Sequence, residues 1–461
     1  MESVNRSNVP APKTGKEFKY PTFEEHFLPN GSKVIYAGKT RLPITIVTLN
    51  IEAGSKYDPQ GGEGLAQITA SLLEEGAGEW SALELNALLE SRGLSLSASA
   101  QTDYLSVTIQ GLSGDIDLMM KILSEVVYQP HFNLEDFERK IDRVKNNVKQ
   151  AKNDPQSMAW FLFSLVVQGK RNGYAYLSAT EESIENITLS DVTYFHAEHI
   201  EPVKPVFNVV SDLPYAEIEA SIIYNFKSIP GIHDPEPADT EFVHKDLRIF
   251  ILDRKGSSQT EILAGLPLPR LGDSLDDAAV LVVNNLYGGH FNSRLNKNLR
   301  EEKGFTYGIN SFLRPMKDSA QYMIMTSVDT GNTGPALLEI LKELNDVRKN
   351  ITDEELEFSK QLLTKGAPFK FETYHFVSML MQSIVSRDLP LDYYSEQPKQ
   401  FSKVDIQNAI TAANNYMLLE NLQIVLVGDF DEIVKTIPAP LLRGVVEIND
   451  SGKVILREQN P

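Results

Sequence analysis

Cysteine is absent from the 461 residues of this chain. Disulfide bonds, thiolate metal sites and a cysteine nucleophile are therefore excluded. Long apolar runs are missing too, since none approaches the roughly 18 residues that a membrane-spanning helix needs. Residues 1–6 contain no apolar segment of the kind found in secretory signals, so no such signal is visible.

Positive charge is scarce: 44 Lys and Arg stand against 63 Asp and Glu, which gives a net charge of −19 at pH 7. This balance argues against nucleic acid or an anionic membrane surface as the main partner. It suits basic or neutral ligands. A hydrophobic content of 42% with 23% charged residues is typical of a soluble globular protein.

The expected order of strands and helices repeats once along the chain. Length alone would suggest about three domains. However, each half is predicted to end with a helix and then a strand that stops at Asp212 or Asp429, and these positions are 429 − 212 = 217 residues apart. A repeat of this length indicates duplication of a whole domain.

We therefore divide the chain into four parts. Residues 1–17 are polar and contain proline, which is typical of a disordered lead-in. Residues 18–225 form the N-terminal domain, with long helices predicted over 134–151 and 155–168. Residues 226–243 carry prolines among acidic residues and form a linker. Residues 244–461 form the C-terminal domain.

Short blocks of sequence follow one another in a fixed order through both halves. Together they resemble the pitrilysin/insulinase metallopeptidases, in particular the branch of bacterial processing proteases. The resemblance covers nearly all of residues 18–429 and implies an α+β fold of two homologous domains. Each domain would be a mostly antiparallel sheet covered by helices, and the two would form a clamshell. The blocks are 28–31 (Leu-Pro-Asn-Gly), 54–57 (Gly-Ser-Lys-Tyr), 64–66 (Gly-Leu-Ala), 130–132 (Pro-His-Phe), 256–259 (Gly-Ser-Ser-Gln) and the longer stretch 293–307.

The zinc signature of that family is His-x-x-Glu-His, on the helix predicted here over residues 64–75. Two imidazoles at i and i+4 share one helical face and hold Zn²⁺, while the Glu acts as general base on the bound water. The matching positions are Gln67, Ala70 and Ser71, and the family's spacing puts the third ligand at Asn147. Neutral oxygen donors bind Zn²⁺ weakly, and Ala70 removes the base. We therefore expect no metal and no cofactor in this chain.

Two residues of the second half match other functional positions of the family. Family members carry an Arg and a Tyr seven residues apart, which correspond to Arg300 and Tyr307, since 307 − 300 = 7. A guanidinium fork and a phenol O–H can both donate to a peptide carbonyl and to the oxyanion that forms from it. His290, next to this block, is a further candidate for substrate contact.

In bacterial two-chain members of the family, one chain bears the zinc motif and its partner bears the Arg/Tyr pair. The resemblance thus implies a non-zinc subunit of a heteromeric zinc peptidase, inactive alone, with Zn²⁺ in a homologous partner and a peptide as substrate. A peptide-binding or scaffolding protein of the same fold is the alternative, and a hydrolase with a relocated metal site is a third reading. The bacterial cytoplasm or the periplasm would suit it, with a lean to the periplasm if a signal has been removed.

Other polar residues are interpreted as structural. His196 and His199 are three residues apart, as metal ligands on a helix can be, but we assign them to a helix end. Glu74 and Glu75 follow the helix with the substituted zinc motif and are expected to be solvated charges. His131 is expected to belong to a loop.

Overall fold

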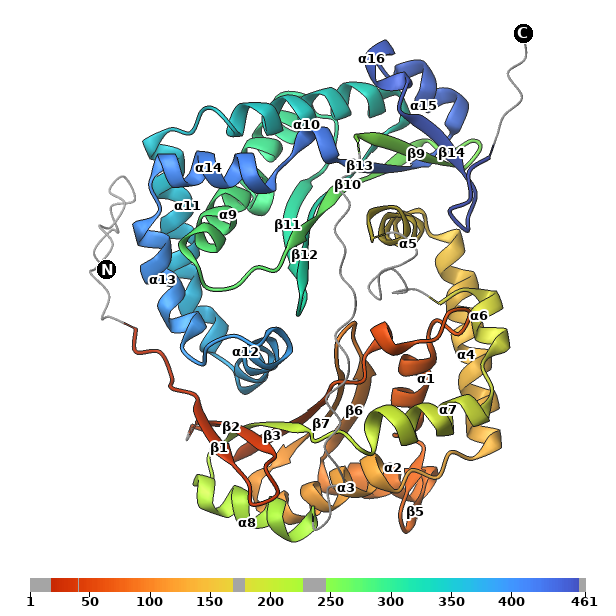
Figure 1. The fold of residues 1–461 in the computed structure, drawn as a ribbon, viewed down its shortest axis with the longest axis vertical. Coiled ribbons are helices and arrows are strands. Elements are labelled where there is room, and N and C mark those ends of the chain that lie inside the picture. The colour runs from red at the N-terminus through yellow and green to blue at the C-terminus, as the bar shows by residue number, and fades with distance from the viewer. Residues whose placement is uncertain (1–17, 40, 169–178, 227–245, 456–461) are drawn as a thin grey trace, which may run out of the picture.

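The computed structural model describes residues 18–39, 41–168, 179–226 and 246–455. The predicted lead-in and all but the first residue of the predicted linker lie outside these ranges. Two six-stranded sheets face each other, and most helices lie on their outer sides (Figure 1). The predicted α+β fold with two sheet-bearing halves is confirmed. Among the described residues, no helix has both the length and the apolar character required to cross a bilayer.

The first sheet has the strand order β1-β2-β8-β3-β7-β6. Only the β2–β8 pair is parallel, so this sheet is mostly antiparallel, as predicted. Its strands are β1 (Glu24–Phe27), β2 (Lys33–Gly38), β3 (Ile44–Ile51), β6 (Ser95–Ala100), β7 (Leu105–Leu112) and β8 (Val206–Ser211).

The second sheet has the order β11-β12-β10-β13-β9-β14, which is the same arrangement read from the other end. Here β9 pairs in parallel with both β13 and β14, and the remaining pairs are antiparallel. The halves differ in one edge strand, which is β1 in the first sheet and β14 in the second. The strands are β9 (Arg248–Asp253), β10 (Gln259–Pro269), β11 (Ile309–Pro315), β12 (Ser319–Asp329), β13 (Gln423–Gly428) and β14 (Val445–Ile448).

Helices of each half pack on the outer face of its own sheet. Several begin with reciprocal capping boxes, in which an N-terminal Ser, Thr or Asp and the residue three positions on bond to each other's backbone. The first half contains α1 (Leu65–Leu72), α2 (Ala82–Arg92), α3 (Ile116–Tyr128), α4 (Leu134–Asn153), α6 (Glu181–Asn186), α7 (Leu189–Phe195) and α8 (Tyr215–Asn225). The second contains α9 (Leu275–Asn284), α10 (Thr333–Val347), α11 (Asp353–Gly366), α13 (Tyr393–Lys403), α14 (Ile406–Tyr416), α15 (Phe430–Thr436) and α16 (Ala439–Leu442).

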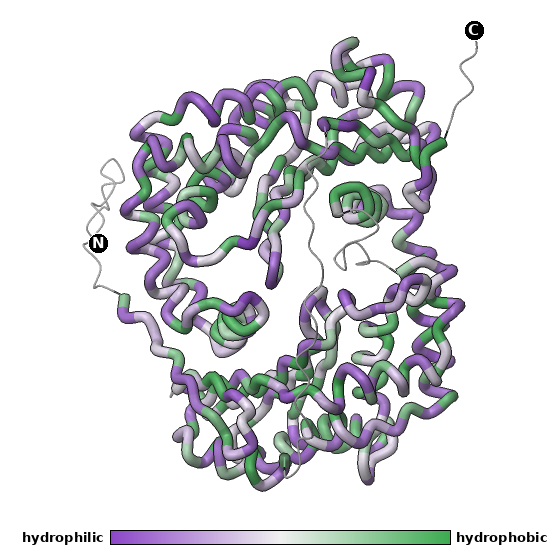
Figure 2. The backbone as a smooth tube through the Cα atoms, in the orientation of Figure 1, coloured by the Kyte–Doolittle hydropathy of each residue, from purple (hydrophilic) through white to green (hydrophobic). Residues whose placement is uncertain are grey.

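Two helices are exchanged between the halves. Helix α5 (Pro155–Gln168) belongs by sequence to the first half, but its buried face packs on the inner face of the second sheet. Helix α12 (Tyr374–Arg387) belongs to the second half and packs on the inner face of the first sheet. Both lie between the sheets and carry apolar residues (Figures 1 and 2). Each half therefore covers the inner sheet face of the other.

Glycine permits the close approach of α5. A Cβ atom at Gly265 on β10 would lie 2.0 Å from the carbonyl oxygen of Tyr322 and 2.8 Å from the ring of Phe163 on α5. Any larger residue would push the helix off the sheet.

A group of charged residues also joins the halves. Lys317, in the turn between β11 and β12, lies 2.6 Å from Glu52 of the first half through its ammonium group. Its backbone N–H donates to Asp103 at 3.1 Å. Lys56 bridges both carboxylates, 2.9 Å from Glu52 and 3.3 Å from Asp103. Burial opposes ionisation of Glu52, but hydrogen bonds from Lys317 and Lys56 outweigh it and lower the pKa of Glu52. This cluster links the two halves at the ends of their hairpins.

Candidate functional site

Helix α1 presents the positions at which zinc ligands were expected. Its start is fixed by Asp58, whose carboxylate accepts from the N–H groups of Gly64 at 2.8 Å and Ala66 at 2.7 Å. Burial raises the pKa of Asp58 to about 7, although these two bonds oppose the rise. Gly64 has φ of 105°, a left-handed conformation that favours glycine at this turn. The local fold of the zinc helix is therefore present.

The side chains on this helix do not fit Zn²⁺. Gln67 Oε1 accepts from the N–H of Ala100 at 2.9 Å, and Ser71 Oγ donates to the carbonyl of Ile68 at 2.8 Å. Ala70 is fully buried, and Asn147 is exposed on α4, which packs against α1. None of the four offers an imidazole, thiolate or carboxylate. Within the described ranges, no group of three or more His, Asp or Glu could hold a metal ion.

The glutamates after α1 make specific contacts, which differs from the solvated charges we expected. Glu74 accepts from the N–H of Ala98 at 2.6 Å. Glu75 forms ion pairs with Lys140 at 2.8 Å and Arg139 at 2.5 Å, which tie α1 to α4. The sequence did not reveal these roles because all three partners are distant from the glutamates along the chain.

Gln67 and Glu74 together cover the free edge of β6. This strand ends the first sheet, so the N–H groups of Ala98 and Ala100 point away from β7. Both donate to the side chains of the α1 segment. An edge strand with satisfied donors is a poor template for an added strand. A peptide that paired with β6 would first have to displace these two side chains.

The histidines assigned to structural roles have structural contacts. His196 is buried, its Nε2 donates to the carbonyl of Val127 at 2.7 Å, and burial lowers its pKa. His199 stacks on Tyr57, with ring centres 5.2 Å apart. His131 Nε2 donates to the carbonyl of Gly78 at 2.9 Å.

Arg300 lies in a π-helical turn, Asn296–Glu302. Its guanidinium carbon is 3.9 Å from the centre of the Phe291 ring, a cation–π contact that fixes one face of the group. Its Nη1 is buried and has no hydrogen-bond partner in the described part of the chain. A buried guanidinium nitrogen without an acceptor is unusual and favours a role in binding.

Tyr307 projects fully into solvent, with 96% of its surface exposed. It lies in a bend two residues before the start of β11. Thr306 holds this bend, because its Oγ1 donates to the carbonyl of Gly308 at 2.9 Å and accepts from its N–H at 3.1 Å. Tyr307 lines a cavity of about 470 Å³ together with Asp154 and Glu261. Burial raises the pKa of Glu261.

His290 lines a different cavity, of about 360 Å³, with residues of α11. Its Nδ1 accepts from the N–H of Asn292 at 3.0 Å, and its ring centre lies 5.3 Å from that of Phe358. Burial, followed by the charge of Lys297, lowers its pKa. The three predicted side chains thus do not line one cavity. His290 and Tyr307 line separate cavities, and Arg300 packs on Phe291, the residue that follows His290.

Two family descriptions match the chain. "Insulinase (Peptidase family M16)" matches residues 33–178, and "Peptidase M16 inactive domain" matches residues 186–363. The chain belongs to peptidase family M16. With its three ligand positions and its general-base position substituted, it is an inactive homologue of the M16 peptidases.

Relatives and solved structures agree with this assignment to M16. "Non-peptidase homolog YmxG" of Helicobacter pylori is 25% identical over 382 residues, which cover 81% of this chain and 86% of that protein. "Uncharacterized zinc protease YmxG" of Bacillus subtilis is 22% identical over 347 residues, 73% of this chain and 81% of that one. The solved "peptidase M16 inactive domain" from Pseudomonas fluorescens has a TM-score of 0.78 at 23% identity and covers 88% of this chain and 98% of its own. A protease from Helicobacter pylori has a TM-score of 0.80 at 18% identity, covering 88% and 100%.

Arg294, in one of the blocks that resemble other M16 proteins, has a clear structural role that the sequence did not reveal. It holds Glu355 through two bonds, Nε to Oε1 at 2.7 Å and Nη2 to Oε2 at 2.8 Å. It also donates to Asp346 at 2.9 Å and to the carbonyl of Asn350 at 2.7 Å. Arg294 therefore fastens the segment that carries Arg300 to α10 and α11.

Proposed function

We propose that this chain is the non-zinc subunit of a two-chain M16 peptidase, which supplies Arg300 and Tyr307 to the zinc site of a homologous partner. The observation that carries this proposal is a contrast between the two halves. On α1, Gln67 and Ser71 are engaged in internal hydrogen bonds and Ala70 has no functional group. In the second half, Tyr307 is exposed and Arg300 has a donor without a partner.

Both side chains suit stabilisation of an oxyanion on a peptide bound at the partner's zinc. The phenol O–H of Tyr307 is free to turn toward a ligand because only its backbone is fixed. The Phe291 ring holds Arg300 on one face and leaves the N–H groups at the edge of the guanidinium for a carbonyl oxygen. Arg300 is held in place in this way, and a preorganised donor of this kind contributes about 2.7–4 kcal/mol to stabilisation of the transition state.

The first test is reconstitution with a homologue that has an intact His-x-x-Glu-His motif, ideally one encoded next to this chain. We expect hydrolysis of a peptide substrate by the mixture and by neither chain alone. Arg300→Ala should lower kcat/KM of the pair by about 10²-fold or more, as for loss of an oxyanion-hole donor. Tyr307→Phe should also lower it. Arg443→Ala is the matched control, because Arg443 is exposed beside α16 and its side chain has no hydrogen bond or ion pair within the described residues.

An unchanged rate for the Arg300→Ala pair would contradict the catalytic role. A complex that binds peptide without cleaving it would favour the second candidate, a peptide-binding or scaffolding protein of this fold. The name of the Helicobacter pylori relative, "Non-peptidase homolog", supports that candidate. Stoichiometric zinc and turnover by the purified chain alone would instead identify a self-sufficient hydrolase.

A further inference from the structure

Arg314 lies near the end of β11, beside the turn to β12. Its direct neighbour across the strand pair is Gln321 on β12. Paired residues of antiparallel strands point to the same face, with Cβ atoms roughly 4.5–5.5 Å apart. Phe312, two residues before Arg314, shares that face, and its ring centre lies 5.7 Å from that of Trp160 on α5. Arg314 and Gln321 therefore lie on the inner face of the second sheet, next to α5.

Neither side chain has a polar partner. Across the described ranges, no hydrogen bond or ion pair involves the guanidinium of Arg314, which is only partly exposed. Burial alone lowers its pKa. Gln321 is 1% exposed, and both its amide nitrogen and its amide oxygen are buried without a hydrogen bond. A desolvated cation beside an unsatisfied amide is costly unless a ligand compensates for it.

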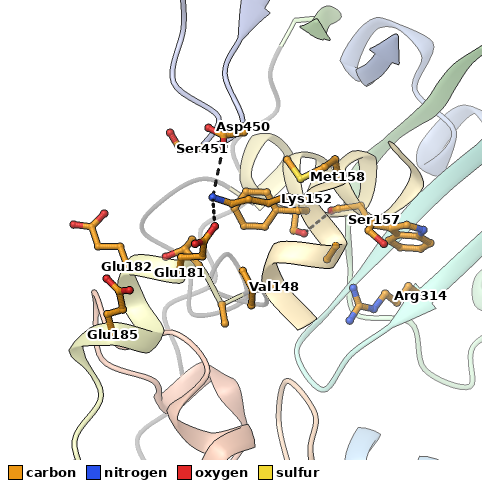
Figure 3. Close-up of a pocket in the computed structure, with 16 residues that line it drawn as sticks. Val148, Lys152, Ser157, Met158, Glu181, Glu182, Glu185, Arg314, Asp450 and Ser451 are labelled. Atoms are coloured by element: carbon orange, nitrogen blue, oxygen red, sulfur yellow. Dashed lines mark hydrogen bonds and ion pairs between the residues drawn. The ribbon is translucent and has the colours of Figure 1, made fainter. Parts of the chain in front are cut away.

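Two cavities between the halves meet at Arg314. It lines one of about 770 Å³, with Trp160 and Phe161 of α5, and another of about 330 Å³, with Met379 and Gln382 of α12. These volumes are in the range of ligand pockets. Figure 3 shows the guanidinium of Arg314 directed into the first cavity. The acidic side chains of α6 lie on the opposite side of this cavity: Glu181, Glu182 and Glu185.

We propose that Arg314 binds the carboxylate of a peptide held between the two halves. The proposal rests on the peptide-binding part of the proposed function. A carboxylate accepts two parallel N–H bonds from arginine, which a neutral peptide group cannot do. Aromatic and aliphatic walls from α5 and α12 suit the apolar side chains of such a peptide. The opposing glutamates disfavour a doubly charged phosphate, because its repulsion from them is larger than that of a single carboxylate.

Three synthetic peptides of one apolar sequence test the site with the full-length chain. The first has a central glutamate and blocked ends, the second has glutamine there and a free C-terminal carboxylate, and the third has glutamine and blocked ends. We expect at least one carboxylate peptide to bind about 10-fold or more tighter than the third, as for a charge-assisted hydrogen bond. The preferred peptide identifies the carboxylate as that of a side chain or of a C-terminus.

Arg314→Gln should abolish this preference and leave binding of the neutral peptide unchanged. Arg314→Lys should keep part of it, since the charge remains but the fork is lost. Arg443→Gln, which removes the same charge at an exposed position, should keep all of it. Equal binding of the three peptides by the unaltered chain, or a preference that survives Arg314→Gln, would overturn the site and leave peptide binding standing. Failure of the chain to bind any of them would overturn this site, whereas the proposed function is judged separately by peptide cleavage in the reconstituted pair.

Discussion

At the scale of single residues, loss of the zinc site has changed side chains and left the backbone arrangement intact. Gln67 and Ser71 are four positions apart on α1, so they share one face of the helix. Asn147 lies on α4, which packs against α1 and is tied to it through Glu75. The two helices that carry the three ligand positions are thus packed together, but without ligands. Restoring the ligands should restore binding.

We predict that the triple variant Gln67→His, Ser71→His, Asn147→Glu binds stoichiometric Zn²⁺. Two imidazoles and one carboxylate form a set that zinc proteins use. The measurement is metal content after dialysis, together with zinc-dependent thermal unfolding, since a ligand that binds only the folded state stabilises it. The control variant has the same two histidines but carries Asn146→Glu instead of Asn147→Glu, which moves the carboxylate about 100° around α4. Equal zinc binding by both triple variants would contradict the assignment of Asn147.

Gln67, Ala70 and Ser71 could be read from the sequence because they lie within one helix with a known spacing. Asn147, on α4, was assigned from the family's spacing alone. Arg300 and Tyr307 were predicted from their separation of seven residues, but the sequence did not reveal their surroundings. Arg314 and Gln321 carry no such signal. They become neighbours only through the register of β11 and β12, and their lack of partners depends on side chains from distant elements.

At the scale of elements, Arg294 joins three segments that the sequence shows only as separate pieces. It links its own helical turn to Asp346 of α10 and Glu355 of α11. Glu355 also accepts from the N–H of Thr352 at 3.0 Å, which caps the start of α11. Burial raises the pKa of Glu355, but bonds from Arg294 and Thr352 outweigh burial and bring the pKa down from 4.5 to about 2.

This depressed pKa predicts a specific acid sensitivity. A carboxyl with a lowered pKa in the folded state adds stability above its unfolded value, and the gain is lost as the pH falls from 4.5 toward 2. Because the group is partly exposed, we expect the contribution to be about 1 kcal/mol. Glu355→Gln should flatten the dependence of unfolding free energy on pH in that window, as measured by urea titrations. Glu354→Gln, at an exposed neighbour, should leave it unchanged, and an equal effect of both variants would refute the assignment.

The whole molecule depends on the exchange of α5 and α12, which periodicity could not predict. The helix over 155–168 was predicted with its observed bounds, because its apolar side chains and the proline at its start are local features. Such a pattern shows that a helix is buried but not which sheet buries it. Each half has a core cluster of its own residues. However, the inner face of each sheet is covered by a helix of the other half, and Lys317 pairs with Glu52 between the hairpins.

We therefore predict that neither half is stable alone and that the two restore each other when produced together. Without α12, a fragment of residues 18–226 exposes Ile35, Ile46 and Val210 on its inner face. Each such side chain contributes about 1.5–3 kcal/mol on burial, and their sum rivals the roughly 5–15 kcal/mol that holds a domain together. A fragment of residues 246–455 has the same defect without α5.

Size-exclusion chromatography and circular dichroism would test this expectation on the single and co-produced fragments. Phe163→Asp in α5 should block recovery, because Phe163 is 1% exposed and packs on the second sheet. Leu83→Asp should not, because Leu83 is 79% exposed on α2. Cooperative unfolding of either fragment as a monomer would mean that the exchanged helices are accessories to complete cores. Co-elution that requires Phe163 would instead show that the two halves fold as one unit. Any movement of one half relative to the other must then keep α5 and α12 packed on their partner sheets.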